Sequence, residues 1–508
     1  MHYLRRVTVS NKTSSDKSLQ SDSTDIQYKV VRNQEGRFAC IRESVAMSKG
    51  WSDTGVHGTQ EKCVQWVDEN WKSALMLSQK VKDSRALLVI VYDDGAAPAY
   101  DIVGDLSAHF KLAFVITSNQ HARDRAAYLQ RFGLVIDGSE VDSAKRELSL
   151  LKPDGIVTYS ERALRLSAEL AAHLSLRFHD MHTILNLTDK FRQRKCLQSA
   201  GVESIRYALI ESQDDWLLAV QQVGLPAVLK PAYGGGSIDT NLITSQQQGE
   251  SVLSELFTRD SIGFSGGNAL ILEEYLVGKA CLPYGDYVSV ESFVDEEIHH
   301  LGITGKMPLS PPFREYGHFW PSPLDSVEHE QVCELAKQAI KALGIKSGIT
   351  HIEIKLTESG PRIIEVNGRL GGGINELSKL SYDKSLLLLA AQQAVGASYS
   401  LVKETLNNVF FNISHIAPTL PCRVLAINNE QFVEALPNVH HYKSYLWNGI
   451  HLEGGTHTRE INIILGQCES HAEFLRLFKL ISESIFYEVK FDSQADSTVL
   501  TAEQFGAI

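Results

Sequence analysis

The spacing of hydrophobic and polar positions changes in character along the chain. Residues 28–43 read as two short strands around a turn at 34–36. Between residues 60 and 75 the apolar side chains recur at spacings of three and four, which is typical of an amphipathic helix. From residue 86 the pattern becomes one of continuous apolar runs, beginning with ALLVIVY, and such runs are typical of buried parallel strands. The first 80 residues and the rest of the chain therefore predict different folds.

Strands that alternate with helices predict a doubly wound α/β layer over roughly residues 86–180. The segments LAFVITS, LVIDG and GIVTYSE continue the strand pattern. The helical segment ERALRLSAELAAHL follows and begins with the final glutamate of GIVTYSE. The layer lacks a G-x-G-x-x-G fingerprint, and the sequence contains no G-x-x-x-x-G-K-[ST] loop. Neither a dinucleotide-binding domain nor P-loop chemistry is expected.

The stretch RIIEVNGRLGGG, residues 362–373, places a carboxylate, an amide and a guanidinium at alternate positions before three glycines. In a strand, Glu365, Asn367 and Arg369 share one face, because side chains alternate from residue to residue. An edge strand with a solvated face is the simpler interpretation. A metal and phosphate site is the alternative that the neighbouring residues favour.

The strand HIEIK precedes this stretch, and the turn sequence LTESGP separates the two. A hairpin centred on Ser359 places Glu353 opposite Glu365. Like charges that face each other across a strand pair are destabilising, and a divalent cation between them reverses the effect. Two carboxylates and an Asn oxygen are hard ligands that suit Mg²⁺. A solvated pair of carboxylates on an exposed face remains the alternative.

Two further segments offer groups that a nucleotide needs. AVLKPAYGGGSIDT contains a strand that reaches Lys230, followed by a glycine-rich turn whose N–H groups can approach anionic oxygens. A plain hairpin turn explains the same residues. ILEEYLVG, residues 271–278, is an apolar strand that ends in two carboxylates, an aromatic residue and a leucine, as a purine and a ribose require. An amphipathic sheet edge gives the same pattern.

These segments, together with Lys190 in TDKFRQRKCLQSAGV, have the order and spacing of the ATP-grasp superfamily. The chain resembles its carboxylate–amine ligase branch, the L-amino-acid and dipeptide ligases of the bacilysin-synthetase kind, over about residues 85–508. PPFREYGHFWPS matches the E-x-G-H-x-x-P pattern of that branch through Glu315 and His318. The chain departs from its relatives at Gly368, where they often have proline, and at Tyr287, where they commonly have glutamate.

The resemblance implies a role for each candidate residue. ATP phosphates would contact Lys190, Lys230 and the loop of Gly234, Gly235, Gly236 and Ser237. Adenine would be held by Glu273, Tyr275 and Leu276, with Glu274 in the same hinge. One or two Mg²⁺ ions would be bound by Glu353, Glu365 and Asn367, and Mn²⁺ is an expected substitute. The catalytic residues would be Arg369, Glu315 and His318.

The implied reaction is ATP- and Mg²⁺-dependent formation of an amide between a carboxylate and an amine, both from amino acids. An acyl phosphate would form first, ADP and phosphate would be released, and Arg369 would stabilise the developing negative charge. Glu315 and His318 would orient the amino acid, and His318 would assist deprotonation of the amine. Two alternatives stay open: an MbtH-type adaptor with a non-catalytic ATP-grasp body, and a carboxylase-like ATP-grasp enzyme. The complete set of lysines, carboxylates, Asn367 and Arg369 argues against the first.

Residues 28–78 resemble the MbtH-like proteins, small partners of the adenylation domains of nonribosomal peptide synthetases. The matching pieces are Y-x-V-V-x-N-x-E, Gly50–Trp51, the G-x-x-G of 55–58, Cys63 and Trp71. The S-x-W-P run of the family is replaced by residues 39–42, Ala-Cys-Ile-Arg, and its R-P pair by Leu75–Met76. Since the missing residues belong to the docking surface, two functions stay open: binding of an adenylation domain, or stabilisation of the attached ligase alone.

The expected fold class is a multidomain combination of α/β and α+β. The expected segments are a disordered tail at 1–25, an MbtH-like ββ(β)α unit at 26–80, a preATP-grasp α/β domain at 85–185, an ATP-grasp domain at 186–400 and a C-terminal α+β cap at 401–508. Relatives are often dimers, so the resemblance implies a homodimer. A setting in peptide natural-product biosynthesis follows by association with the MbtH-like unit.

Composition narrows the cellular setting. The net charge of −12, with no basic stripe, argues against nucleic-acid binding. No apolar run reaches 18 residues, so no membrane span is expected, and the polar N-terminus gives no sign of a secretory signal. Seven scattered cysteines fit a reducing cytoplasm. The resemblance to the carboxylate–amine ligases implies small-molecule carboxylate and amine substrates as partners.

Overall fold

The computed structural model describes residues 27–33, 38–45, 47, 51–60, 62–67, 84–259, 269–401 and 406–508. The chain divides into two compact units, the first ending at Arg85 and the second beginning at Ala86. The tail predicted at 1–25 and the turn predicted at 34–36 lie outside the described residues. Among the described helices, none is both long and apolar enough to cross a bilayer.

The first unit contains a three-stranded antiparallel sheet in the order β2-β1-β3. Its strands are β1 (Tyr28–Asn33), β2 (Phe38–Arg42) and β3 (Trp51–Gly58). Residues 62–67 are helical, as predicted, and the rest of that predicted helix after residue 67 lies outside the described part. Buried Cys63 on this helix donates a hydrogen bond to the carbonyl of Tyr28, 3.4 Å away. The predicted strands of this unit are confirmed.

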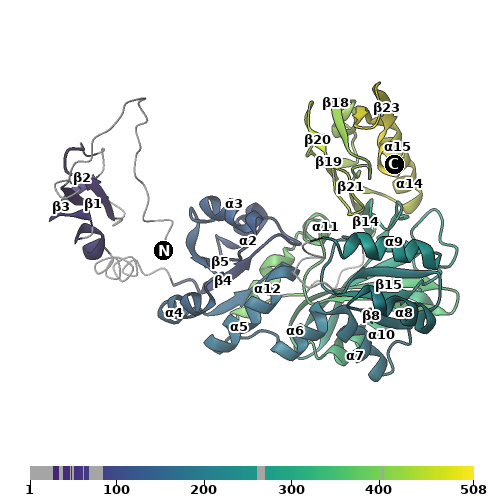
Figure 1. Cartoon of the computed structure of the whole chain (residues 1–508), viewed down its shortest axis with the longest axis horizontal. Coiled ribbons are helices and arrows are strands. Elements are labelled where there is room, and N and C mark those ends of the chain that lie inside the picture. The colour runs from purple at the N-terminus through teal and green to yellow at the C-terminus, as the bar shows by residue number, and fades with distance from the viewer. Residues whose placement is uncertain are drawn as a thin grey trace. The chain divides into compact units, whose positions relative to one another are not determined.

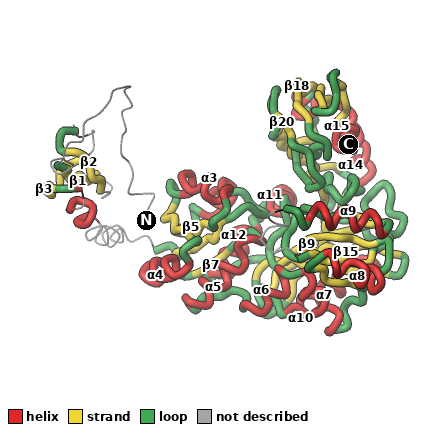
Figure 2. Tube along the Cα trace, viewed as in Figure 1, coloured by secondary structure: helices red, strands yellow, loops and turns green. Residues whose placement is uncertain are grey.

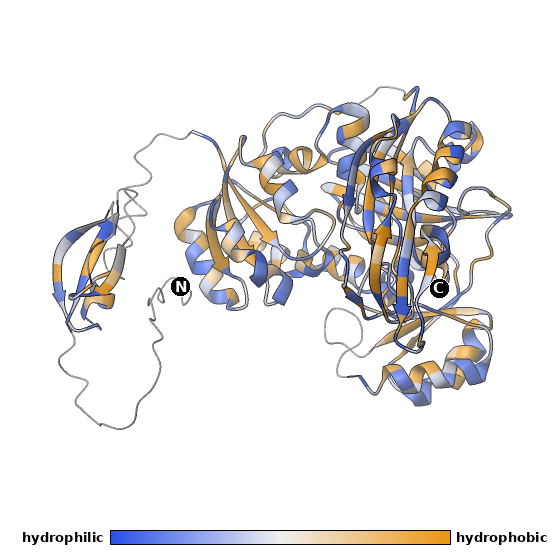
Figure 3. Cartoon of the chain, turned by 90° about the horizontal axis from the view of Figure 1, so that it is seen from above, coloured by the Kyte–Doolittle hydropathy of each residue, from blue (hydrophilic) through white to orange (hydrophobic). Residues whose placement is uncertain are grey.

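The second unit begins with a parallel sheet in the order β6-β5-β4-β7. The strands are β4 (Leu87–Tyr92), β5 (Lys111–Ile116), β6 (Gly133–Asp137) and β7 (Gly155–Val157), and Figure 3 shows them as largely apolar. One core cluster joins one face of β4 to α2 (Ala99–Leu106) and α3 (Gln120–Leu129). Another joins the opposite face to α4 (Val141–Leu151) and α5 (Leu164–Leu174). The predicted α/β layer is confirmed.

Two helices lead from this layer to a small antiparallel sheet. The helices are α6 (Met181–Thr188) and α7 (Lys190–Ser199). The sheet has the order β10-β9-β11-β8, with β8 (Tyr207–Ile210), β9 (Ala227–Pro231), β10 (Asn241–Ile243) and β11 (Leu270–Glu274). Residues of α8 (Trp216–Val223) and α9 (Gln246–Leu256) complete its core. Figure 2 shows these two helices on the outside of the unit.

An eight-stranded antiparallel sheet of the second unit has the order β16-β15-β12-β13-β14-β17-β21-β19, and Figure 1 labels its strands β14, β15, β19 and β21. Five strands come from the predicted ATP-grasp segment: β12 (Tyr287–Val294), β13 (Ile298–Lys306), β14 (Gly317–Trp320), β15 (Gly348–Thr357) and β16 (Gly360–Asn367). The helices α10 (Ser326–Leu343), α11 (Ile374–Tyr382) and α12 (Leu386–Ala394) pack around this sheet.

The C-terminal segment contributes to two sheets. Its strands β17 (Val409–Ile413), β19 (Val439–Ser444) and β21 (Asn462–Cys468) continue the eight-stranded sheet. A second sheet has the order β20-β18-β22-β23, with β18 (Cys422–Asn428), β20 (His451–Leu452), β22 (Phe486–Phe491) and β23 (Thr498–Thr501). The helices are α13 (Glu430–Glu434), α14 (His471–Ser484) and α15 (Ala502–Ala507). The segment expected as a cap is thus joined to the central sheet by hydrogen-bonded strands.

The hairpin of β15 and β16 contains a β-bulge that decides which carboxylates meet. Near the turn, Thr357 pairs with Gly360 and Ile354 with Ile363, so the two turn residues are 358 and 359. The register then shifts by one residue, which leaves Ile364 unpaired and places Glu353 opposite Glu365. The predicted carboxylate pair is confirmed, although the hairpin does not centre on Ser359.

Candidate functional site

A cavity of about 760 Å³, here called the first cavity, lies between the small antiparallel sheet and the β12–β15–β16 part of the central sheet. The predicted site residues that line it are Lys190, Lys230, Gly234, Gly235, Gly236, Ser237, Glu273, Glu274, Tyr275, Leu276, Glu315, Glu353 and Glu365. His318, Asn367 and Arg369 do not line it. Asp94 and Gly95, which follow β4, also line the first cavity. The strand order of the parallel sheet reverses between β4 and β7, because β5 and β6 lie on the other side of β4. Such a point is the usual binding position in an α/β sheet.

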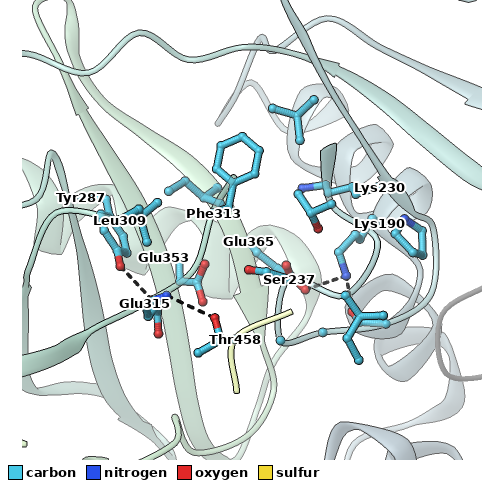
Figure 4. A pocket seen from close by; sticks show the side chains of 18 of the residues that line it. Lys190, Lys230, Ser237, Tyr287, Leu309, Phe313, Glu315, Glu353, Glu365 and Thr458 are labelled. Carbon is cyan, nitrogen blue, oxygen red and sulfur yellow. Dashed lines mark hydrogen bonds and ion pairs between the residues drawn. The ribbon is translucent and has the colours of Figure 1, made fainter. Parts of the chain in front are cut away.

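Lys190 is placed by the start of α7. The carboxylate of Asp189 caps the helix by accepting hydrogen bonds from the backbone N–H groups of Phe191 and Arg192, at 3.0 and 3.1 Å. The Lys190 ammonium lies 2.9 Å from the Glu365 carboxylate and donates to the carbonyl of Gly234. This one side chain therefore links α7, the carboxylate hairpin and the glycine loop (Figure 4).

Lys230 is held by a buried triad of charges. Its ammonium lies 2.8 Å from Glu273, and the Arg194 guanidinium donates to both oxygens of the same carboxylate, at 2.8 and 3.0 Å. Burial alone would raise the pKa of Glu273, but the two cations lower it to about 2. Both oxygens of the Glu273 carboxylate have cationic partners, so this side chain orients Lys230. Only the main-chain groups of Glu273 are left to contact a bound base. The sequence analysis missed Arg194, which lies one helical turn after Lys190.

The loop between β9 and β10 has an unusual backbone. Gly234 has φ +148°, Gly236 has φ +69° and Ser237 has φ +57°, values that favour glycine at the first two positions. A succession of such residues turns backbone N–H groups toward a common side, where an anion can be bound. The loop and the two lysines line the same cavity, so positive and N–H-rich groups converge on it.

The far wall of the first cavity is apolar. Ile205, Val228, Tyr275, Leu276 and Ile364 line it, and the bulge in β16 is what presents Ile364. Glu274 at the rim forms an ion pair with Arg206 at 2.6 Å. A flat apolar slot beside an N–H-rich loop and two lysines suits a ligand that combines a planar ring with anionic groups.

Glu353 and Glu365 point toward each other in the first cavity (Figure 4). Burial alone would raise the pKa of Glu353, but His351, whose Nε2 atom lies 3.4 Å away, holds it below its usual value. Within the described residues no group of three or more His, Cys, Asp or Glu side chains is arranged to hold a metal ion. Two carboxylates fit a cation such as Mg²⁺ that keeps waters or substrate phosphates in its remaining positions. Buried Asn367, the third predicted ligand, instead accepts a hydrogen bond from Arg369 at 3.3 Å.

Arg369 lies beside a smaller cavity of about 60 Å³. Its Nε atom is 3.3 Å from the carboxylate of Glu161, which follows β7 in the α/β layer. Burial raises the pKa of Glu161, the Arg369 charge opposes the rise, and Glu365 reinforces it. Neither Glu161 nor Arg369 is among the residues that line the first cavity. The sequence analysis assigned no role to Glu161.

A second cavity has a volume of about 870 Å³. His318 lines this cavity, and Glu315 lines both the first and the second cavity. His318 is 7% exposed, and neither of its ring nitrogens has a hydrogen-bond partner. Burial, reinforced by the charge of Lys306, lowers the pKa of His318 to about 3. A neutral imidazole with so low a pKa is a weak base, so this environment favours an orienting role over proton abstraction.

A buried charge network includes Glu315, which lines both cavities. Lys306 donates to Glu315 at 3.2 Å, and the hydroxyl of Tyr287 donates to the same carboxylate at 3.0 Å. Glu291, facing His351 across β12 and β15, lies 2.8 Å from its Nδ1 atom. Burial alone would lower the pKa of His351, but the Glu291 charge raises it to about 9. The sequence analysis missed Lys306, Glu291 and His351, because only the strand pairing brings them together.

Comparison with known protein families identifies two regions of the chain. Residues 223–376 match the ATP-grasp domain, and residues 17–82 match the MbtH-like proteins. The alanine–anticapsin ligase of Bacillus subtilis (strain 168) is 30% identical over 246 residues, 46% of this chain and 52% of that protein. The L-arginine-specific L-amino acid ligase of B. subtilis is 26% identical over 295 residues, 57% of this chain and 68% of that protein.

The fold has a counterpart of known structure. The crystal structure of L-amino acid ligase from Bacillus licheniformis superposes with a TM-score of 0.64 at 18% identity, covering 79% of this chain and 98% of that one. This likeness concerns the fold. The chain spans about half the length of the alanine–anticapsin ligases that it matches. It contains an ATP-grasp domain, preceded by an MbtH-like region.

Proposed function

We propose that this protein is an ATP- and Mg²⁺-dependent ligase that joins the carboxylate of one amino acid to the amine of another. The observation that carries the proposal is the opposed pair of Glu353 and Glu365, which shares one cavity with Lys190, Lys230 and the glycine loop. The names of the relatives, alanine–anticapsin ligase and L-arginine-specific L-amino acid ligase, support the same class of reaction. Peptide natural-product biosynthesis is the proposed setting.

In this proposal ATP occupies the first cavity. The adenine ring lies in the apolar slot beside Tyr275 and Leu276, and the loop of residues 234–237 covers the phosphates. Lys190 and Lys230 balance the phosphate charge. The ammonium of Lys190 already lies against Glu365, a carboxylate that a divalent cation can take over. Mg²⁺, or Mn²⁺ in its place, is held by Glu353 and Glu365, with Asn367 as a proposed third ligand. When bound, the metal neutralises charge on the transferring phosphoryl group.

Transfer of the phosphoryl group to a substrate carboxylate gives an acyl phosphate and ADP. An amine then attacks the acyl carbon, the C–O bond to phosphate breaks, and an amide and phosphate remain. Arg369 stabilises the oxygens of the acyl phosphate, which requires its guanidinium to turn from Glu161 toward the first cavity. Glu315, held by Tyr287 and Lys306, orients the amino acid together with His318.

The partners of the chain form a second part of the proposal. Residues 26–80 either dock an adenylation domain of a nonribosomal peptide synthetase or stabilise the ligase body alone. Co-purification with an adenylation domain, using Ala39→Ser/Ile41→Trp/Arg42→Pro to restore the family's S-x-W-P run, distinguishes the two. Capture by the restored variant alone supports the stabilising role. We also propose a cytoplasmic location and a homodimer, which size-exclusion chromatography with light scattering tests.

The test of the ligase is phosphate release from Mg-ATP with single amino acids and with pairs, followed by mass spectrometry of the products. Pair-dependent release that matches an amide product, and that is lost in Glu365→Ala, supports the proposal. Release that depends on bicarbonate without an amine favours the carboxylase-like alternative. ATP binding with no release from any mixture favours the adaptor alternative, and overturns the ligase if an expanded panel of carboxylates gives the same result.

A further inference from the structure

The second cavity is formed by three parts of the unit that are far apart in sequence. Helices α2 and α3 border it on one side, β14 and the start of α11 on another, and β19 with the residues before β21 on the third. It shares six lining residues with the first cavity: Asp94, Gly95, Glu315, Tyr445, Thr458 and Glu460. It therefore opens onto the place where the proposed reaction activates a carboxylate.

One end of the second cavity, here called the acidic pole, consists of Glu376 and Glu460. The Oε2 atom of Glu376, on α11, is buried and has no hydrogen-bond partner. Glu460 comes from the C-terminal segment and accepts a hydrogen bond from the Ser414 hydroxyl at 3.2 Å. Burial and the charges of Asp101 and Glu460 raise the pKa of Glu376 to about 7, and burial also raises the pKa of Glu460. No ion pair joins either carboxylate to a cation among the residues that the structure describes.

Two aromatic rings stand next to the acidic pole. Tyr100 from α2 and Tyr445 from the C-terminal segment both line the second cavity. The ammonium of Lys443 lies over both rings, 4.8 Å from the centroid of Tyr100 and 5.0 Å from that of Tyr445. Aromatic faces attract cations. The protein's own lysine thus shows that an alkylammonium group fits against these rings.

The charges around the pole do not balance. Five carboxylates line the second cavity against three Lys or Arg side chains and His351, which is cationic because its pKa is about 9 but is paired with Glu291. One of these cations, Lys306, is paired with Glu315, and Arg125 lies on α3. Outside the lining, Lys379 is paired with Asp105 at 2.6 Å, and the charges of Lys379 and His441 oppose the raised pKa of Asp101. Lys443 is the cation that remains at the pole.

A second observation points to a ligand independently of the carboxylates. His318 lines the same cavity, is 7% exposed, and has no hydrogen-bond partner at either ring nitrogen. A buried imidazole without partners loses the hydrogen bonds that it makes in water. A polar ligand in the second cavity would restore them.

We propose that the second cavity binds an amino acid with a cationic side chain, of the lysine or arginine class, whose charged end lies against the acidic pole and the rings of Tyr100 and Tyr445. This assignment rests on the proposed ligase function and names the substrate class of that same site. The competing assignment is that the acidic pole binds the α-ammonium group that every amino acid carries.

The test is a binding titration of the full chain, in the presence of Mg-ADP, with L-arginine and its neutral isostere L-citrulline, and with L-lysine and L-norleucine. We expect arginine to bind about 10- to 100-fold more tightly than citrulline, as loss of a charge-assisted contact implies. Glu376→Gln and Glu460→Gln should each lower the arginine affinity by about tenfold and leave citrulline unchanged. Glu434→Gln, an exposed glutamate at the end of α13, is the matched control.

The outcomes separate this inference from the ligase proposal, because binding is measured without turnover. Equal affinities for arginine and citrulline overturn the inference. An equal loss of affinity for both ligands in Glu376→Gln also overturns it, because that result assigns the acidic pole to the α-ammonium group. Amide formation from neutral amino acids leaves the ligase standing in either case. If Glu376→Gln does not fold, Glu460→Gln and Lys443→Met carry the test, and Lys443→Met should tighten arginine binding by removing the competing ammonium.

Discussion

The two cavities of this protein are built on opposite electrostatic principles. In the first cavity each candidate cation already lies against a carboxylate, as Lys190 does with Glu365 and Lys230 with Glu273. In the second, carboxylates crowd together, and the pKa of Glu376 is raised to about 7. The first is therefore pre-organised for a ligand whose charge pattern is fixed, such as a nucleotide. The second is electrostatically incomplete until a cation arrives.

The cavities also differ in how far apart in sequence their residues lie. Most of the candidate residues of the first cavity come from short motifs between Lys190 and Glu365. The second gathers Tyr100, Glu376 and Tyr445 from three distant segments. The proposed nucleotide site thus keeps a recognisable sequence signature, whereas the proposed substrate cavity is formed by loops and helices that carry none.

The largest expected effect concerns the carboxylate pair of the first cavity. Glu365→Ala removes one of two proposed metal ligands and the partner of Lys190, so amino-acid-dependent phosphate release should fall by at least about 10²- to 10³-fold. Glu358→Ala, an exposed glutamate in the turn of the same hairpin, is the matched control and should keep its rate. Equal rates for Glu365→Ala and the unchanged protein would remove the first cavity from the reaction.

A second prediction tests whether the paired charges of the first cavity contribute to stability. Glu273→Ala leaves the buried charges of Arg194 and Lys230 without their carboxylate, which should lower the free energy of unfolding by about 3–5 kcal/mol. Glu274→Ala, which breaks the rim pair with Arg206, should cost about 1 kcal/mol or less. Urea denaturation of both variants measures the difference, and similar losses would contradict the distinction between buried and rim pairs.

The acidic pole should make stability depend on pH. Because the pKa of Glu376 is about 7 in the folded protein and 4.5 is its ordinary value, the folded state binds this proton more tightly. Ionisation of Glu376 should therefore lower the free energy of unfolding as pH rises from about 4.5 to about 7, by up to about 3 kcal/mol. The Glu376→Gln variant should lack this fall in the free energy of unfolding with pH. In the unchanged protein, bound arginine should make the fall smaller. Parallel pH profiles for the two proteins would contradict the electrostatic description.

The smallest expected effect concerns the first unit. Every residue that lines either cavity comes after Arg85, and residues 86–508 form their own compact unit. A chain that begins at residue 84 should therefore keep its kcat/KM for amide formation within about twofold. Loss of activity accompanied by unfolding would instead support a stabilising role for the MbtH-like region.

Local patterns predicted the parts of the site that lie within one or two strands. Lys190, Lys230 and the glycine loop could be recognised from their own segments, and the turn sequence paired Glu353 with Glu365. The bulge at Ile364 carries no local signal, since it depends on how β16 pairs with β15. Partners such as Glu291 with His351 were missed for the same reason, because neither residue has a recognisable neighbour in its own segment.

Arg369 shows the limit of reasoning from the face of a strand. Alternation along β16 placed it with Glu365 and Asn367, but the strand ends at Asn367, and the guanidinium turns to Glu161. The central sheet also extends into the C-terminal segment, a connection that requires pairing between β14 and β17, about 90 residues apart in the sequence. The contact of Arg369 with Glu161 and the pairing of β14 with β17 both join residues far apart in the sequence, and no local sequence pattern predicts such contacts.

The continuation of the central sheet into β17 restricts how this chain can be recombined with a related one. A chimaera that exchanges everything after residue 400 would sever the hydrogen bonds between β14 and β17 and expose β14 as a new sheet edge. A segment chosen for exchange must instead keep β14 and β17 from the same parent protein. The sheet β20-β18-β22-β23, α14 and α15 share one hydrophobic core with β14, β17 and β21, so they have to be exchanged together with those strands.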